Sequence, residues 1–141
     1  MISWDLFLPG QNKVASSQAL IHHSPLISHL SSLITQNMEI TVQQLKEKLN
    51  SGDKFLLLDV REPWEFEEFN LGGQLMPVGD LMNKMWELED QKEAEIVVHC
   101  RSGARSAMAQ GLLMANGFKN VRNLKGGVIE WEAVFGKGVK P

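Results

Sequence analysis

Two short, largely apolar segments constrain the fold of this 141-residue chain more than any other feature. One runs from Phe55 to Val60, and the other consists of Ile96 to Val98 followed by His99. Near-continuous apolar runs of this length are typical of strands that are buried on both faces. Segments with helical character alternate with these strands, which predicts an α/β domain whose parallel sheet is covered by helices on both faces.

The first helices carry recognisable start and stop signals. Thr41 is followed three residues later by Gln44, a capping box that predicts a helix start, and Gly52 follows the end of that helical run. Pro63 suits the first position of a short helix that reaches about Phe69. Both helices flank the first predicted strand, as an α/β order requires.

The remainder of the chain continues the alternation. The expected elements are a strand at 75–78, a helix through 81–88, a helix at about 105–116, a strand at 121–124 and a final helix after Gly126-Gly127. Met108, Leu112 and Ala115 recur at helical spacing, which predicts that they form the apolar face of their helix. We expect Trp64 and Trp131 to be core aromatic residues.

The sequence changes character near residue 38. Residues 1–37 contain one charged pair, Asp5 and Lys13, together with many Ser, Gln and His residues. We interpret this part as an N-terminal extension with one amphipathic helix at about 25–36, which packs on the domain or on a partner; a loosely ordered leader is the alternative. Residues 38–135 are the predicted α/β domain, and 136–141 are a short C-terminal tail.

Composition excludes several classes of function. The net charge of −3 makes nucleic acid an unsuitable partner. No apolar run reaches the roughly 20 residues that span a bilayer, and the N-terminus lacks secretory features, so we predict a cytoplasmic protein without a membrane partner. The single cysteine excludes an internal disulfide framework and a zinc site built from several cysteines. We therefore predict neither a metal nor a cofactor.

The most informative segment lies between the second apolar strand and the helix that follows it. It consists of Cys100, Arg101, Ser102, Gly103, Ala104, Arg105 and Ser106. A turn before a helix collects backbone N–H groups without intrahelical partners, and the helix dipole adds partial positive charge there. Such an environment stabilises a cysteine thiolate. The two arginines add cationic character, and the glycine lets the backbone approach an anion closely.

Two reactions can use a thiolate in a cradle of hydrogen-bond donors. One is attack on phosphate, which gives a cysteinyl-phosphate intermediate; the other is attack on the outer sulfur of thiosulfate or of a persulfide, which leaves a persulfide on the cysteine. Four residues separate Cys100 from Arg105, one fewer than in cysteine phosphatases. The smaller loop favours sulfur transfer, and a cysteine phosphatase or arsenate reductase is the less favoured alternative.

Four segments resemble the rhodanese (sulfurtransferase) family and occur in the order found in that family. They are DVREPWEF at 59–66, the loop 100–106, GFKNV at 117–121 and GGVIEW at 126–131. The resemblance implies a rhodanese-like three-layer fold, in which helices flank a central, mostly parallel sheet. One departure is at 69–73, where this chain has Phe-Asn-Leu-Gly-Gly and the family often has Gly-His-Ile.

The resemblance also implies a function and a set of site residues. It implies that Cys100 carries the persulfide, that 101–106 form the substrate-binding loop, and that Asp59 and Arg61 support the site from a neighbouring strand end. A structural ion pair is the alternative role of Asp59 and Arg61. Thiosulfate or a persulfide would be the donor, and a thiol, another nucleophile or a sulfur-carrier protein the acceptor. A sulfur-relay or regulatory binding module with little stand-alone turnover is the alternative function.

Overall fold

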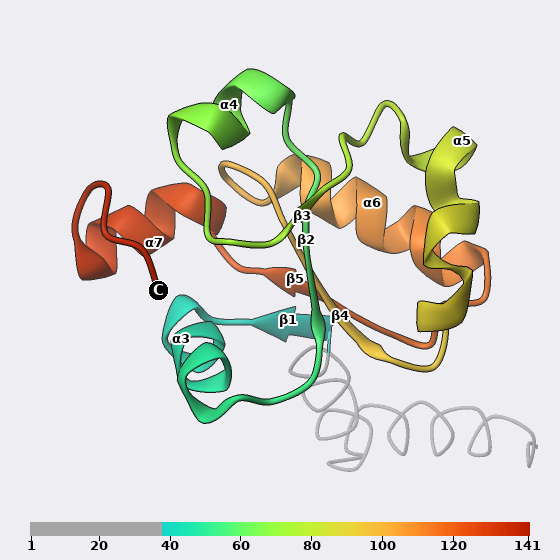
Figure 1. The fold of residues 1–141 in the computed structure, drawn as a ribbon, viewed down its shortest axis with the longest axis horizontal. Helices are drawn as coiled ribbons and strands as arrows, with labels where there is room; N and C mark the ends of the chain where they lie inside the picture. Colours follow the sequence, from blue (N-terminus) through green and yellow to red (C-terminus); the bar gives the residue numbers. More distant parts are fainter. Residues whose placement is uncertain (1–37) are drawn as a thin grey trace, which may run out of the picture. The chain divides into compact units, whose positions relative to one another are not determined.

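The computed structural model describes residues 38–141, which form a five-stranded sheet with helices on both faces (Figure 1). The predicted helix at 25–36 and the rest of the extension lie outside the described residues. The strands are β1 (Glu39–Ile40), β2 (Leu56–Asp59), β3 (Gln74–Leu75), β4 (Glu95–His99) and β5 (Asn120–Leu124). Their order is β1-β5-β4-β2-β3, and each neighbouring pair is parallel. The structure confirms the predicted α/β fold.

Helices cover the two faces of the sheet, and one short helix follows the carboxyl end of β2. They are α3 (Val42–Ser51), α4 (Pro63–Glu68), α5 (Leu81–Lys84), the 3-10 helix η1 (Met85–Gln91), α6 (Ala104–Ala115) and α7 (Gly127–Phe135). Side chains of α5, η1 and α6 pack in one core cluster, and those of α3 and α7 pack in another. Among the described residues, no helix is both long enough and apolar enough to cross a membrane.

The two clusters follow from the alternation of side chains along β2 and β4. Leu58 and Val98 point to the cluster that includes Leu113 of α6, whereas Leu57 and Val97 point to the opposite cluster. Cys100 continues the side of Val98 and lies in the first cluster. The strand that fills the core therefore also directs the sulfur toward the α6 side of the sheet.

The helix starts agree with the sequence signals. At α3, the Gln44 N–H donates to the Thr41 hydroxyl at 3.1 Å, and the Thr41 N–H donates to the Gln44 side chain at 2.9 Å. This is the predicted capping box. At α4, Pro63 occupies the first turn, where its missing N–H has no intrahelical partner to lose.

Several details of the sequence-based prediction are wrong. The expected helix through 81–88 is a short α-helix followed by a 3-10 helix, and the expected strand at 75–78 contains only Leu75 of that range. Trp64 is 62% exposed rather than a core aromatic, whereas Trp131 is fully buried. The two-residue strand β1 was not predicted, because two residues give no detectable periodicity.

The buried face of α6 also differs from the prediction. Met108 is 62% exposed, and the helix instead buries Ser106, Ala109, Gln110 and Leu113. The two polar residues can lie inside because their side chains are hydrogen-bonded; the Gln110 amide, for example, donates to the carbonyl of Val121 at 2.8 Å. An apolar stripe therefore misidentifies the core face of a helix whose buried polar groups all have partners.

Candidate active site

Cys100 directly follows β4, and its sulfur is held by the turn that leads into α6. The Gly103 N–H donates to Sγ at 3.0 Å, and the Ser106 hydroxyl oxygen lies 3.3 Å from Sγ. The side chain is only 1% exposed, but it faces these polar groups rather than apolar neighbours alone. A sulfur atom at a helix N-terminus with convergent donors is arranged to carry negative charge.

The protonation of the thiol reflects two opposing effects. Burial raises the pKa of Cys100, because it penalises the charged form. Hydrogen bonds from the Ser106 hydroxyl and from the N–H groups of Ser106, Gly103 and Ser102 lower it, and together they outweigh burial. The net result is a pKa below the ordinary value of a cysteine. At neutral pH, a larger fraction of Cys100 is therefore thiolate than in an exposed cysteine.

The turn requires glycine at its last position. Gly103 has φ +109°, in the left-handed region that side-chain-bearing residues avoid, and α6 begins at the next residue. This conformation directs the Gly103 N–H at the sulfur. From the sequence we expected this glycine to let the backbone approach an anion. Its left-handed conformation is compatible with that role, because it brings the backbone N–H to 3.0 Å from the sulfur.

The first turn of α7 closes the site from another side. The Val128 N–H donates to the Cys100 carbonyl at 3.1 Å, and the Ile129 N–H donates to the Arg101 carbonyl at 3.0 Å. A Cβ on Gly127 would lie 2.5 Å from both of these carbonyl oxygens, so only glycine permits this approach. Gly127 thus lets the first turn of α7 pack directly against the cysteine loop.

Arg105 braces the loop through an ion pair with Glu65 of α4. Its two terminal nitrogens contact the two carboxylate oxygens at 2.7 and 2.8 Å. The Arg105 hydrogen bonds lower the pKa of Glu65 to about 2, against the opposing effect of burial. Glu65 raises the pKa of Arg105 in turn, and the charge of Cys100 adds to that increase. Arg105 is thus held by Glu65, and the direction of its pKa shift also reflects the charge of Cys100.

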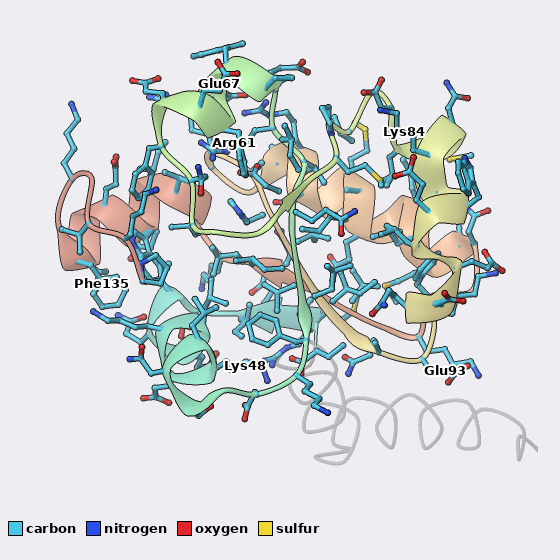
Figure 2. All side chains as sticks on the ribbon, viewed as in Figure 1. Lys48, Arg61, Glu67, Lys84, Glu93 and Phe135 are labelled. Atoms are coloured by element: carbon cyan, nitrogen blue, oxygen red, sulfur yellow. The ribbon has the colours of Figure 1, made fainter. Side chains whose placement is uncertain are left out.

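Asp59 and Arg61 form a second ion pair, which is almost completely buried. Arg61 Nη2 lies 2.7 Å from Asp59 Oδ2 and 2.7 Å from the Phe69 carbonyl oxygen. Figure 2 shows Arg61 beneath α4, whereas Glu67 lies on the outer side of the same helix. His99 Nε2 is 3.6 Å from Asp59 Oδ2, and burial lowers the pKa of His99. These contacts fix the chain after β2 and match the structural role considered from the sequence.

Asn123 on β5 is a site residue that the sequence did not indicate. Its Oδ1 lies 2.6 Å from the Ser106 hydroxyl oxygen, and its amide nitrogen donates to the Gly103 carbonyl at 3.2 Å. The available signal was its position two residues after Val121, which places it on the same side of the strand as that apolar residue. Glu65 was also missed, although its spacing from Glu62 is that of a capping box, which the structure contains.

The remaining loop residues lie at the surface. Arg101, Ser102 and Ala104 are exposed, and Arg101 borders a pocket of about 190 Å³ that is also lined by residues of α4 and α7. The structure thus brings the whole predicted loop together around Cys100, with small, hydrogen-bonded groups inside and Arg101 at the rim. Asp59 and Arg61 form the buried pair described above, and Arg61 lines the same pocket as Arg101.

Cys100 is thus a buried thiol with a lowered pKa, held by hydrogen-bond donors at the carboxyl edge of a parallel sheet, an arrangement suited to a nucleophilic cysteine. The family model of the rhodanese-like domain matches residues 41–134. The chain belongs to the rhodanese-like domain family, and this relationship supports a role in sulfur transfer or sulfur relay.

Individual relatives agree with this assignment. A sulfurtransferase of Allochromatium vinosum is 36% identical over 94 residues, which cover 66% of this chain and 86% of that protein. YrkF of Bacillus subtilis, whose name proposes a sulfur carrier, is 34% identical over 73% of this chain and 55% of its own length. A crystal structure of a rhodanese-related protein from Thermoplasma volcanium has a TM-score of 0.61 at 28% identity, covering 69% of this chain and 92% of that one.

Proposed function

We propose that the protein is a sulfurtransferase in which Cys100 carries the transferred sulfur as a persulfide. The Cys100 thiolate attacks the outer sulfur of thiosulfate, the new S–S bond forms, and sulfite leaves with the electron pair of the broken bond. A thiolate acceptor then attacks the terminal sulfur and releases the Cys100 thiolate. The observation that carries this proposal is the environment of Cys100 Sγ, which lies 3.0 Å from the Gly103 backbone nitrogen and 3.3 Å from the Ser106 hydroxyl oxygen.

In this proposal, the backbone of the loop would bind the transferred sulfur, and the exposed Arg101 at its rim would bind the anionic donor. The N–H groups of Ser102, Gly103 and Ser106 contribute to the low pKa of Cys100, and the same groups would hold the terminal persulfide sulfur. Arg101, exposed at the rim, would attract an anionic donor such as thiosulfate. Arg105 would support the charge of the sulfur while its ion pair with Glu65 keeps the loop in place.

Intact-protein mass spectrometry tests this function directly. After thiosulfate treatment and removal of excess reagent, we expect the wild-type protein to gain the mass of one sulfur atom, and dithiothreitol to remove it. Cys100→Ser is the matched control, because it keeps the size and polarity of the side chain without a nucleophilic sulfur. Wild-type protein that gains no sulfur from thiosulfate, or from a persulfide donor such as glutathione persulfide, would contradict the proposal.

A sulfur-relay role is the second candidate, and the similarity to YrkF favours it. Such a module would form the same adduct but release sulfur slowly to small thiols and cyanide. We expect rapid release to small acceptors for an independent enzyme, and a persistent adduct for a relay module. Hydrolysis of an aryl phosphate that Cys100→Ser abolishes would instead indicate phosphatase chemistry.

We also propose that residues 38–135 contain all of the machinery for sulfur loading, in a cytoplasmic setting that suits a lone reduced thiol. The site contacts described above lie within this range, from Asp59 to Ile129. A chain that starts at Met38 is expected to fold and to gain one sulfur atom as the full chain does. Loss of loading in a folded truncated chain would assign a role in the reaction to residues 1–37.

A further inference from the structure

The hydrogen bonds around Asn123 have only one consistent direction. The Gly103 carbonyl can only accept, so the Asn123 amide nitrogen, 3.2 Å away, must be the group that faces it. This orientation places Oδ1, which also can only accept, 2.6 Å from the Ser106 hydroxyl oxygen. The Ser106 hydrogen must therefore point at Asn123 in this arrangement.

Ser106 has one hydroxyl hydrogen and three acceptors within reach. Asn123 Oδ1 is the nearest at 2.6 Å, whereas the Gly103 carbonyl oxygen is at 3.2 Å and Cys100 Sγ is at 3.3 Å. When the hydrogen points at Asn123, a lone pair of the Ser106 oxygen faces the sulfur. That lone pair can accept the hydrogen of a neutral thiol, but it repels a thiolate. In this orientation the Ser106 hydroxyl does not stabilise the thiolate, whereas the Gly103 N–H still donates to the sulfur.

We propose that Asn123 is a positioning residue that holds the Ser106 hydrogen away from Cys100 in the resting protein and gives it up when the sulfur becomes negative. Rotation of the hydroxyl breaks the bond to Asn123 Oδ1 and makes a new bond to the thiolate. The bond from Asn123 to Gly103 keeps the turn in place during this change. Ser106 is fully buried and Asn123 is 8% exposed, so bulk water competes little for these groups. This inference rests on the proposed role of Cys100 as the nucleophile.

The charged and titratable groups around the sulfur come from α4, from α6, from the cysteine loop and from the ends of β2 and β4, and they are separate from the Ser106–Asn123 pair. Arg105 on α6 is bound to Glu65 of α4, and Arg101 is exposed in the loop. The Asp59–Arg61 pair and His99 lie at the ends of β2 and β4. None of the hydrogen bonds described for these side chains involves Ser106 or Asn123. The effect of Asn123 on the thiol can therefore be separated from theirs by substitution.

The pH dependence of Cys100 alkylation by iodoacetamide tests the proposal in the full chain. With Asn123→Ala, Ser106 loses its nearest acceptor and its hydrogen can turn to the sulfur, so we expect the alkylation pKa of Cys100 to fall by about half to one unit, the value of one hydrogen bond. In a Ser106→Ala background, the same substitution should no longer lower the alkylation pKa, because the hydrogen that Asn123 holds is absent. Asn120→Ala, an exposed position on the same strand, is the matched control and should leave the profile unchanged.

Asn123→Asp provides the opposite test and nearly preserves the size of the side chain. It keeps an oxygen that accepts from Ser106 and adds negative charge, so the alkylation pKa should rise. A substitution that merely loosened the turn would raise the pKa in both variants. The proposal is overturned if Asn123→Ala raises the pKa or leaves it unchanged, if the fall in pKa persists without Ser106, or if Asn123→Asp fails to raise it. Alkylation needs no sulfur donor, so these outcomes are independent of persulfide formation.

Discussion

Two arginine–carboxylate pairs lie near the cysteine loop, and they differ in burial and in what they connect. In the Asp59–Arg61 pair, the side chains are 0% and 4% exposed, and the residues are two apart in the sequence. In the Glu65–Arg105 pair, the side chains are 7% and 34% exposed, and the residues are 40 apart. The first pair is local and deeply buried, whereas the second joins two helices at the rim of the site.

This difference assigns the two pairs to different properties of the protein. Arg61 uses its guanidinium on Asp59 and on the Phe69 carbonyl, so it is committed to holding the chain between β2 and β3. Arg105 is bound to Glu65, and its pKa is raised by Glu65 and also by the charge of Cys100. The buried pair should therefore govern the stability of the fold, and the rim pair should also govern the reactivity of the sulfur.

The largest effect is expected when the buried pair is broken. Arg61→Ala would leave the Asp59 carboxylate buried without its partner, and the free energy of unfolding should fall by about 3–5 kcal/mol. Urea denaturation followed by circular dichroism measures this loss.

Removal of both charges provides the control for this prediction. In Asp59→Asn with Arg61→Met, no unpaired charge remains, and most of the lost stability should return. A double variant as unstable as Arg61→Ala would show that packing of the arginine side chain, rather than its charge, stabilises this region.

A smaller and pH-dependent effect is expected at the rim. Glu65→Gln replaces a charged hydrogen-bond acceptor by a neutral one, which should cost about 1–2 kcal/mol at neutral pH, since Arg105 is partly exposed. The pKa of Glu65 is about 2 in the folded protein, below the ordinary 4.5. Its stabilising contribution is therefore complete above pH 4.5 and is lost as the pH falls toward 2. The difference between wild type and Glu65→Gln should shrink over that range in urea denaturation.

Glu67→Gln controls for the loss of one carboxylate from the same helix. Glu67 is exposed on the outer side of α4, as Figure 2 shows, so its removal should change stability little. Equal losses in the two variants, or a Glu65→Gln difference that does not depend on pH, would count against a specific ion pair with Arg105.

The sequence was sufficient to predict the elements that depend on local signals. The buried strands, the Thr41–Gln44 capping box and Pro63 at the start of α4 all appear in the structure, because each depends on residues that are neighbours in the chain. The cysteine loop was recognisable for the same reason, since its glycine, arginines and serine lie within one short segment.

Partners from distant segments could not be predicted in this way. Glu65 meets Arg105 across 40 residues, and Asn123 meets Ser106 across 17 residues. Periodicity does not reveal such contacts, because they depend on how the sheet orders its strands. The exposure of Met108 has a related cause: Ser106 and Gln110 occupy the buried face of α6 through bonds to distant residues.

The smallest predicted effect concerns the sulfur rather than the fold. Arg105→Gln removes a positive charge that is coupled to Cys100, so the alkylation pKa of Cys100 should rise by about half a unit, a modest amount because the arginine is partly exposed. Lys84→Gln removes the same charge from an exposed position on α5 and should leave the profile as in wild type. If both variants shift the pKa equally, the effect reflects net charge alone. A rise confined to Arg105→Gln would show that the rim pair acts on the nucleophile, because a folded protein that has lost only this guanidinium then holds its thiolate less well.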